Sequence, residues 1–211
     1  LETSRLIIPH QIHGARVRRI DEAFFMQTDA VKAATLEGVD AVMTDVPKVC
    51  VSVSTADCIP ILIYDRVHHA VAAVHAGWRS TVLRISEAVL QAMAGAYGTR
   101  PQDVEAAIGP GISLEAFEVG DEVYEAFRTA GFPMEEMARR YPATGDGSGR
   151  MEKWHLDLWQ ANRDLLEGCG VPSARIRMAG VCTYLHSERF FSARRLGIRS
   201  GRILNGIFLT D

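Results

Sequence analysis

Residues 49–79, VCVSVSTADCIPILIYDRVHHAVAAVHAGWR, decide the fold of this chain. Apolar and polar residues alternate over residues 49–54, whereas residues 59–64 and 70–74 form continuous apolar runs. Alternation predicts a β-strand with one buried face, and a short continuous apolar run is typical of a strand that is buried on both faces. Only short turns separate the three runs. We therefore expect three consecutive strands, of which the last two lie inside a covered sheet.

Outward from this stretch, the chain contains both helical and strand patterns. Residues 80–96 place Ile85, Val89 and Met93 on one face of a predicted helix. Similar patterns predict helices over residues 114–130 and 157–167, and strands over residues 40–44, 175–182, 189–193 and 203–209. Residues 141–150 (YPATGDGSGR) are typical of an exposed loop. Helices and strands do not alternate strictly, which favours an α+β fold with mixed β-sheets over a doubly wound parallel fold.

The composition is that of one globular domain, residues 1–211. Hydrophobic residues make up 47% of the chain and charged residues 23%, with a formal net charge of −3. Nucleic-acid and membrane-surface proteins usually carry a basic excess, so we expect neither partner. No apolar run is long enough to span a membrane, and no signal peptide is visible. Four cysteines are too few for a disulfide scaffold, which favours reduced thiols in a cytoplasmic protein.

Three residues with metal-binding side chains lie where predicted strands begin or end. His13 precedes a glycine, Cys58 lies between two apolar strands, and His75 ends an apolar strand ahead of a helix. Such positions bring side chains together on a rigid scaffold. Two imidazoles and a thiolate suit zinc, and a site with three protein ligands keeps a position open for water or substrate. The pattern therefore indicates a catalytic zinc site.

The residue pattern leaves two other interpretations open. The three residues are 45 and 17 positions apart, which is not a short metal-binding signature. A buried Cys58 and two histidines bonded to backbone groups would be a purely structural arrangement. Alternatively, Cys58 is a nucleophile and His75 is the base that lowers its pKa, without any metal.

Seven motifs along the chain occur in the same order in one known family. They are QIHG at 11–14, TADCIPILIYD at 55–65, VHAGWRST at 74–81, AIGPGIS at 107–113, FEVG at 117–120, LDLWQANRDLL at 156–166 and CTYLHSERFFSARR at 182–195. On these motifs the chain resembles the laccase-domain or polyphenol-oxidase-named proteins, which are regarded as purine nucleoside phosphorylases with adenosine deaminase activity. The resemblance covers nearly the whole chain.

The resemblance implies a fold, a metal and a reaction. The family's three zinc ligands fall on His13, Cys58 and His75. Its fold is a sandwich of mixed β-sheets with outer helices, which looks like the catalytic domain of cytotoxic necrotizing factors. The implied substrates are a purine nucleoside and phosphate. The family's N-terminal segment with a Phe-Ser-Thr-Arg-x-Gly-Gly motif is not found before His13, so we expect part of the pocket wall to be missing.

Further site residues follow from the chemistry of the two reactions. Zinc deaminases add a carboxylate that carries a proton, and Asp57 beside Cys58 is the candidate; the alternative is a turn residue that caps backbone amides. Phosphorolysis needs cationic groups that hold phosphate. Arg79, near a predicted helix start, is the first candidate, and its alternative is a surface arginine. Arg194 and Arg195 are weaker candidates.

Three other functions compete with this one. A cysteine hydrolase or amidase would use Cys58 as nucleophile with His75 and no metal. A copper-dependent polyphenol oxidase would need many histidines in His-x-His pairs, and the chain has seven histidines and no such pair. A metal-binding module without catalysis is the third. The sequence does not indicate an oligomeric state or a preferred nucleoside.

Overall fold

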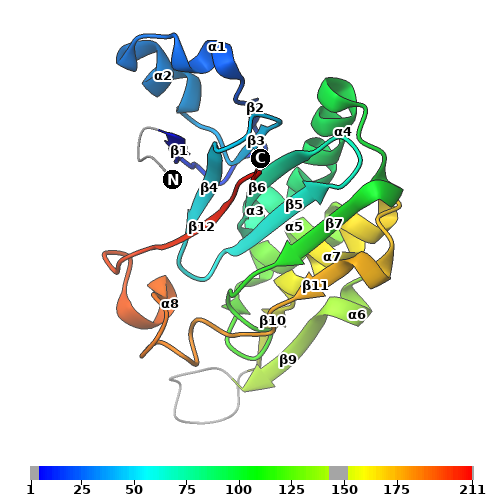
Figure 1. Cartoon of the computed structure of the whole chain (residues 1–211). Coiled ribbons are helices and arrows are strands. Elements are labelled where there is room, and N and C mark those ends of the chain that lie inside the picture. The colour runs from blue at the N-terminus through cyan, green and yellow to red at the C-terminus, as the bar shows by residue number, and fades with distance from the viewer. Residues whose placement is uncertain (1–4, 143–151, 211) are drawn as a thin grey trace.

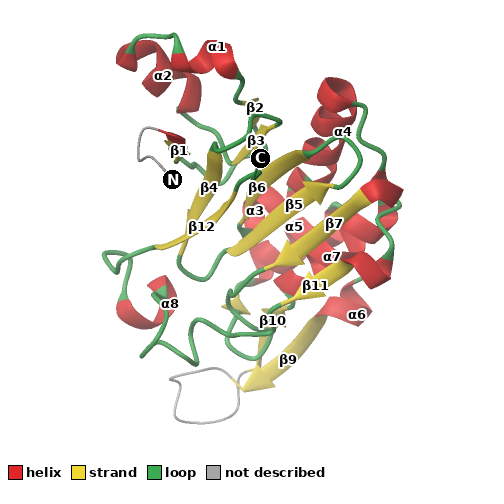
Figure 2. Cartoon of the chain, viewed as in Figure 1, coloured by secondary structure: helices red, strands yellow, loops and turns green. Residues whose placement is uncertain are grey.

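The computed structural model describes residues 5–142 and 152–210 of the chain. Its centre is a six-stranded mixed sheet that lies between a layer of helices and a smaller sheet (Figures 1 and 2). This arrangement confirms the predicted α+β fold with mixed sheets. Among the described residues, no helix is long and apolar enough to cross a membrane.

The stretch over residues 49–79 forms three consecutive strands, as predicted. β4 (Cys50–Thr55) belongs to the smaller sheet, whereas β5 (Ile59–Asp65) and β6 (Ala70–Ala76) form an antiparallel hairpin at the centre of the larger one. The strand order of the larger sheet is β11-β7-β5-β6-β3-β2. Its other strands are β11 (Ile176–Met178), β7 (Val104–Ile108), β3 (Ala41–Thr44) and β2 (Val17–Arg19).

Both faces of the central hairpin are buried, which explains its continuous apolar sequence. Ile61 and Ile63 face a core that they share with the helices, whereas Leu62 packs against the core on the opposite side. The helical layer consists of α3 (Trp78–Val82), α4 (Ile85–Tyr97), α5 (Asp121–Thr129), α6 (Met134–Met137) and α7 (Leu158–Gly168). The smaller sheet has the order β1-β4-β12, with β1 (Leu6–Ile7) and β12 (Ile203–Ile207).

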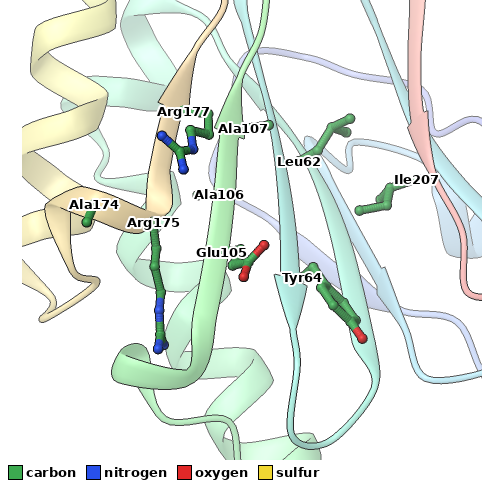
Figure 3. Close-up of a pocket in the computed structure, with 9 residues that line it drawn as sticks. All are labelled: Leu62, Tyr64, Glu105, Ala106, Ala107, Ala174, Arg175, Arg177 and Ile207. Atoms are coloured by element: carbon green, nitrogen blue, oxygen red, sulfur yellow. The ribbon is translucent and has the colours of Figure 1, made fainter.

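The smaller sheet covers only part of the larger one. β12 is its outermost strand, and the strands beyond it, β7 and β11, carry the exposed residues Glu105, Ala107 and Arg177. These residues line a shallow hollow of about 340 Å³, together with Tyr64 and Ile207 (Figure 3). The strands around this hollow carry none of His13, Cys58 and His75.

Two predicted helices differ from the structure. The predicted helix over residues 80–96 is divided into α3 and α4 at Arg84, whose left-handed φ of 59° turns the chain so that α4 packs on β6. The predicted helix over residues 114–130 is wrong in its first part, because Glu118–Val119 forms the strand β8, which pairs with β10 (Glu152–Leu156). Only the second part is the helix α5. The spacing of apolar residues did not predict either change, because each depends on contact with a segment that is distant in the sequence.

Other predicted elements are confirmed or corrected by local chemistry. Asp157 caps α7 by accepting a hydrogen bond from the backbone N–H of Gln160, as its position predicts. The predicted strand over 189–193 is wrong: a turn leads there into α8 (Ala193–Leu196), which Ser192 caps. The predicted strand over 175–182 is shorter, because β11 ends before Gly180, whose φ is 62°.

The third sheet and the first two helices were not predicted. The third sheet has the order β8-β10-β9, with β10 (Glu152–Leu156) and β9 (Ala138–Pro142). The helices α1 (Glu22–Phe25) and α2 (Asp29–Leu36) follow β2. The predicted loop over 141–150 begins inside β9, and its residues 143–150 lie outside the described residues.

Candidate metal centre and active site

His13, Cys58 and His75 meet at one end of the central hairpin. Their ligand atoms all lie within 4.8 Å of one another, close enough for one metal ion to contact all three. The register of the hairpin explains the meeting, because Ile59 pairs with Ala76 and so brings the preceding cysteine to the end of β6. His75 is buried, Cys58 is half-buried and His13 is exposed, so the cluster opens toward solvent on one side.

Asp40 organises both histidines from inside the sheet. Its fully buried carboxylate accepts a hydrogen bond of 2.8 Å from Nδ1 of His75. It also accepts hydrogen bonds from the backbone N–H groups of His13 (2.9 Å), Gly14 (2.7 Å) and Ile12 (3.2 Å). A carboxylate that holds the far nitrogen of a histidine fixes which nitrogen faces a metal. Sequence reasoning missed this residue; the only signal was an acidic residue that starts an otherwise apolar strand.

Hydrogen bonds within the cluster control its protonation. Burial raises the pKa of the Cys58 thiol, but its hydrogen bonds with His13 and His75 outweigh burial and lower that pKa to about 6. Burial lowers the pKa of His75, but hydrogen bonds with Asp40 and Cys58 outweigh it and raise that pKa to about 9. For Asp40, burial is again outweighed, by the bonds from His75 and Gly14, and its pKa lies below the ordinary value. Cys58 is therefore a thiolate at neutral pH, the form that binds metals or attacks carbon.

Gly77 lets the backbone pass directly beside the cluster. A Cβ atom at this position would lie 2.9 Å from Cδ2 of His13 and 3.0 Å from Sγ of Cys58. Both distances are shorter than ordinary van der Waals contacts. The glycine that follows His-Ala in the sequence is therefore required by the space that the cluster occupies.

The cluster forms part of the wall of a cavity of about 610 Å³. Its apolar wall comes from Trp78, Ile112, Phe117 and Ile198. The other lining residues, apart from the cluster, are Gln11, Ser54, Thr55, Ala56, Asp57, Ala193, Arg194 and Arg202. A cavity of this volume lies within the range of small-molecule binding sites, and its mixed lining suits a ligand with a flat apolar part and polar groups.

Asp57 lies in the cavity wall, but both of its carboxylate oxygens have partners. Oδ1 accepts a hydrogen bond of 2.7 Å from the hydroxyl of Thr183, and Oδ2 accepts one of 2.7 Å from the backbone N–H of Arg194. The backbone of Asp57 is left-handed, with a φ of 86°. This geometry matches the interpretation of Asp57 as a turn residue that binds backbone amides. Its role in carrying a proton stays a prediction.

The predicted arginines lie in different places. Arg79 is exposed and stacks its guanidinium 4.2 Å from the centre of the Trp78 ring, and it is not among the lining residues. Arg195 lies 5.1 Å from the Tyr184 ring and is likewise outside the lining. Arg194 lines the cavity. Arg202 also lines it and was missed, since no sequence pattern connects this loop residue with the cluster.

Comparison with known proteins gives one family throughout. The family described as multi-copper polyphenol oxidoreductase laccase matches residues 1–210. A relative named purine nucleoside phosphorylase from Bacteroides thetaiotaomicron is 48% identical over 204 residues, which are 97% of this chain and 73% of the relative. A relative named adenosine deaminase RL5, from an unknown prokaryotic organism, is 45% identical over 96% of this chain and 74% of the relative.

Solved structures agree with the sequence relatives. The structure of YlmD from Geobacillus stearothermophilus superposes with a TM-score of 0.82 at 30% identity and covers 99% of this chain and 74% of its own. The structure of the hypothetical protein YfiH from Bacillus licheniformis gives a TM-score of 0.84 at 27% identity, covering 99% and 76%. The chain therefore spans about three quarters of the length of these relatives.

Proposed function

This chain belongs to the family described as multi-copper polyphenol oxidoreductase laccase, and from that membership we propose that it is a zinc-dependent enzyme that processes purine nucleosides. Its reactions are the phosphorolysis of adenosine- and inosine-type nucleosides and the deamination of adenosine. The observation that carries the proposal is the cluster of His13, Cys58 and His75 in the wall of a cavity sized for a small molecule. The names of two relatives, a purine nucleoside phosphorylase and an adenosine deaminase, support the substrate class.

The residues of the cluster fit a zinc ion. Their donor set of two imidazole nitrogens and one thiolate is a set that zinc prefers, and it leaves one position of a tetrahedron open. Asp40 holds Nδ1 of His75, so Nε2 is the nitrogen available to a metal. When bound, zinc would supply a Lewis acid that lowers the pKa of a coordinated water toward neutrality.

Other residues of the chain bind and orient the substrates. Trp78 and Phe117 provide aromatic surface in the cavity for a purine, whose flat ring stacks on such side chains. Arg194 is the predicted arginine that lies in the wall, and its planar guanidinium suits phosphate. Asp57, the residue that was predicted to carry a proton in deamination, also lines the cavity, where both of its carboxylate oxygens already accept hydrogen bonds from the protein.

One incubation tests the proposal. Purified protein is mixed with adenosine, with and without phosphate; the products are separated by chromatography, and the metal content is measured on the same sample. We expect adenine in the presence of phosphate, inosine without it, and about one zinc per chain. The Cys58→Ala variant should lose both zinc and product. Full turnover by a protein stripped of zinc would overturn the metal-dependent mechanism.

A second candidate function has a specific observation in its favour. Asp40, His75 and Cys58 form a hydrogen-bonded series in which a carboxylate orients an imidazole beside a thiolate. This is the arrangement of a cysteine hydrolase, and it agrees with the likeness that we propose to the catalytic fold of cytotoxic necrotizing factors. Amidase activity that persists after chelation and stops on alkylation of Cys58 would favour this alternative.

The proposal also covers the identity of the metal and the cellular compartment of the protein. The family's description names copper, but multi-copper sites need paired histidines, and the chain has seven histidines with no His-x-His pair. We therefore place zinc, not copper, in the cluster. All four cysteines are free, which supports a reducing compartment and thus a cytoplasmic enzyme.

A further inference from the structure

Three segments of the cavity wall meet at Asp57. The first is the turn between β4 and β5, which contains Asp57 itself. The second is the turn at Ile112, whose backbone N–H donates to the carbonyl of Asp57. The third is the segment over residues 182–195, which binds the Asp57 carboxylate through Thr183 and Arg194. Asp57 thus connects parts of the chain that are far apart in sequence.

The bond between Asp57 and Thr183 is protected from water. Thr183 is fully buried and only 9% of Asp57 is exposed. The left-handed backbone of Asp57 is a conformation that a side chain disfavours, and such strain persists only when the surroundings hold it in place. The surrounding hydrogen bonds provide that support, so this geometry is a built feature of the wall.

Arg194 is held at three points. Its backbone N–H donates to Asp57, its Nη1 donates to the carbonyl of Glu118 at 2.9 Å, and its guanidinium lies 5.6 Å from the centre of the Phe117 ring. The bond to Asp57 is the one that fixes the backbone. It also satisfies an N–H at the start of α8, next to the one at Arg195 that Ser192 satisfies.

We propose that Asp57 is a positioning residue, whose carboxylate clamps the 182–195 segment so that Arg194 points its guanidinium into the cavity. This role differs from proton transfer, because both carboxylate oxygens already accept hydrogen bonds within the protein. Asp57 acts on substrate binding through Arg194 and not on the reacting atoms. The kinetic part of the inference rests on the proposed function, whereas the clamp itself does not.

The sharpest test weakens the clamp without touching Asp57, by deleting the bond that holds the other oxygen of its carboxylate. Thr183→Val deletes the hydroxyl that binds Oδ1, Thr183→Ser keeps it, and Thr129→Val is the control at an exposed threonine on α5. Each variant is examined by hydrogen–deuterium exchange, zinc analysis and steady-state kinetics. We expect the amide of Arg194 to exchange about tenfold faster in Thr183→Val, since the deleted bond holds the carboxylate that accepts from this amide and one hydrogen bond contributes about that factor. Thr183→Ser and Thr129→Val should exchange like the wild type.

The kinetics should show a specific coupling. Thr183→Val should raise the KM for phosphate about tenfold with kcat and zinc content unchanged, as expected for one lost hydrogen bond. In the Arg194→Gln background the same substitution should have no further effect, because the residue that it positions is already lost. A proton-transfer role for Asp57 predicts instead that Thr183→Val leaves the KM unaltered.

Two results would overturn the clamp: unchanged exchange at Arg194 in Thr183→Val, or effects of Thr183→Val and Arg194→Gln that multiply. If Thr183→Val loses zinc or does not fold, Asp57→Ala replaces it. An alanine removes both acceptor oxygens, so exchange at Arg194 must accelerate. If the wild type processes no purine nucleoside, the proposed function fails, and the exchange data still decide the clamp.

Discussion

On one side of the cavity, Asp40 holds His75 and the turn at His13 from within the central sheet; on the other, Asp57 holds the loop segment that carries Arg194. Both residues are buried carboxylates that accept hydrogen bonds from side chain and backbone. Asp40 is rigid because strands surround it, whereas Asp57 joins turns that have no sheet of their own. The side of the cavity that carries the His/Cys/His cluster is therefore part of the core, and the side that carries Arg194 is attached to it.

The largest effect should come from the cluster itself. We expect His13→Ala, Cys58→Ala and His75→Ala each to lose zinc and activity together, by more than the about 10- to 100-fold loss that follows removal of a hydrogen-bond partner of a metal ligand. Metal analysis and turnover are measured on the same samples, with circular dichroism as the check on folding. A folded variant that keeps its activity without zinc would contradict the role of the cluster as a catalytic metal site.

The protonation of Cys58 should depend strongly on His75. With a pKa of about 6, most of Cys58 is thiolate at pH 7; at the ordinary value near 9, the thiolate fraction would be about a hundredfold smaller. In metal-free protein, the iodoacetamide reaction of Cys58 should therefore rise with pH through about 6. In His75→Ala the rise should move to higher pH. Identical pH profiles for the two proteins would contradict the hydrogen-bonded pair, and bound zinc should protect Cys58 in the wild type.

The two carboxylates can be compared directly. Asp40→Asn should lower zinc affinity about 10- to 100-fold, because an asparagine has no charge and a single acceptor oxygen, which cannot serve both His75 and the N–H of Gly14. Asp57→Asn is the matched control and should keep its zinc, since its hydrogen bonds run to Thr183 and Arg194. Zinc affinity is measured by competition with a chelating dye. Equal zinc loss in both variants would show that the two sides do not act separately.

The smallest effects should separate the two arginines. Arg194→Gln should raise the KM for phosphate about tenfold or more, since a hydrogen bond to a charged group contributes about 1.5–3 kcal/mol. Arg79→Gln should change it less than about twofold, as is usual for an exposed residue outside a binding site. Steady-state kinetics at varied phosphate distinguish them, and the opposite order would move the phosphate site to the start of α3.

The difference between the two sides also explains what the sequence could predict. The strands β5 and β6 follow from local patterns, and His13, Cys58 and His75 stand out because their residue types and strand-end positions suit a metal. Asp40 and Arg202 were missed because their roles depend on partners that only folding brings near. The segment over 182–195 was wrongly predicted to contain a strand over 189–193, because the spacing of its apolar residues does not distinguish a strand from a turn. Its shape comes from bonds to Asp57, which no local pattern reveals.

The edge strand β12 has a consequence for solubility. Its outer side carries backbone groups without a neighbouring strand in the described part of the chain, and such edges can recruit strands from other molecules and start aggregation. Gly206 lowers the tendency of this segment to extend a sheet, and the charged side chains of Glu105 and Arg177 lie beside the hollow that an incoming strand would have to cover. The charged residues that line the hollow of Figure 3 therefore disfavour nonspecific pairing of another strand with β12. The edge itself is not covered by any strand of the described residues.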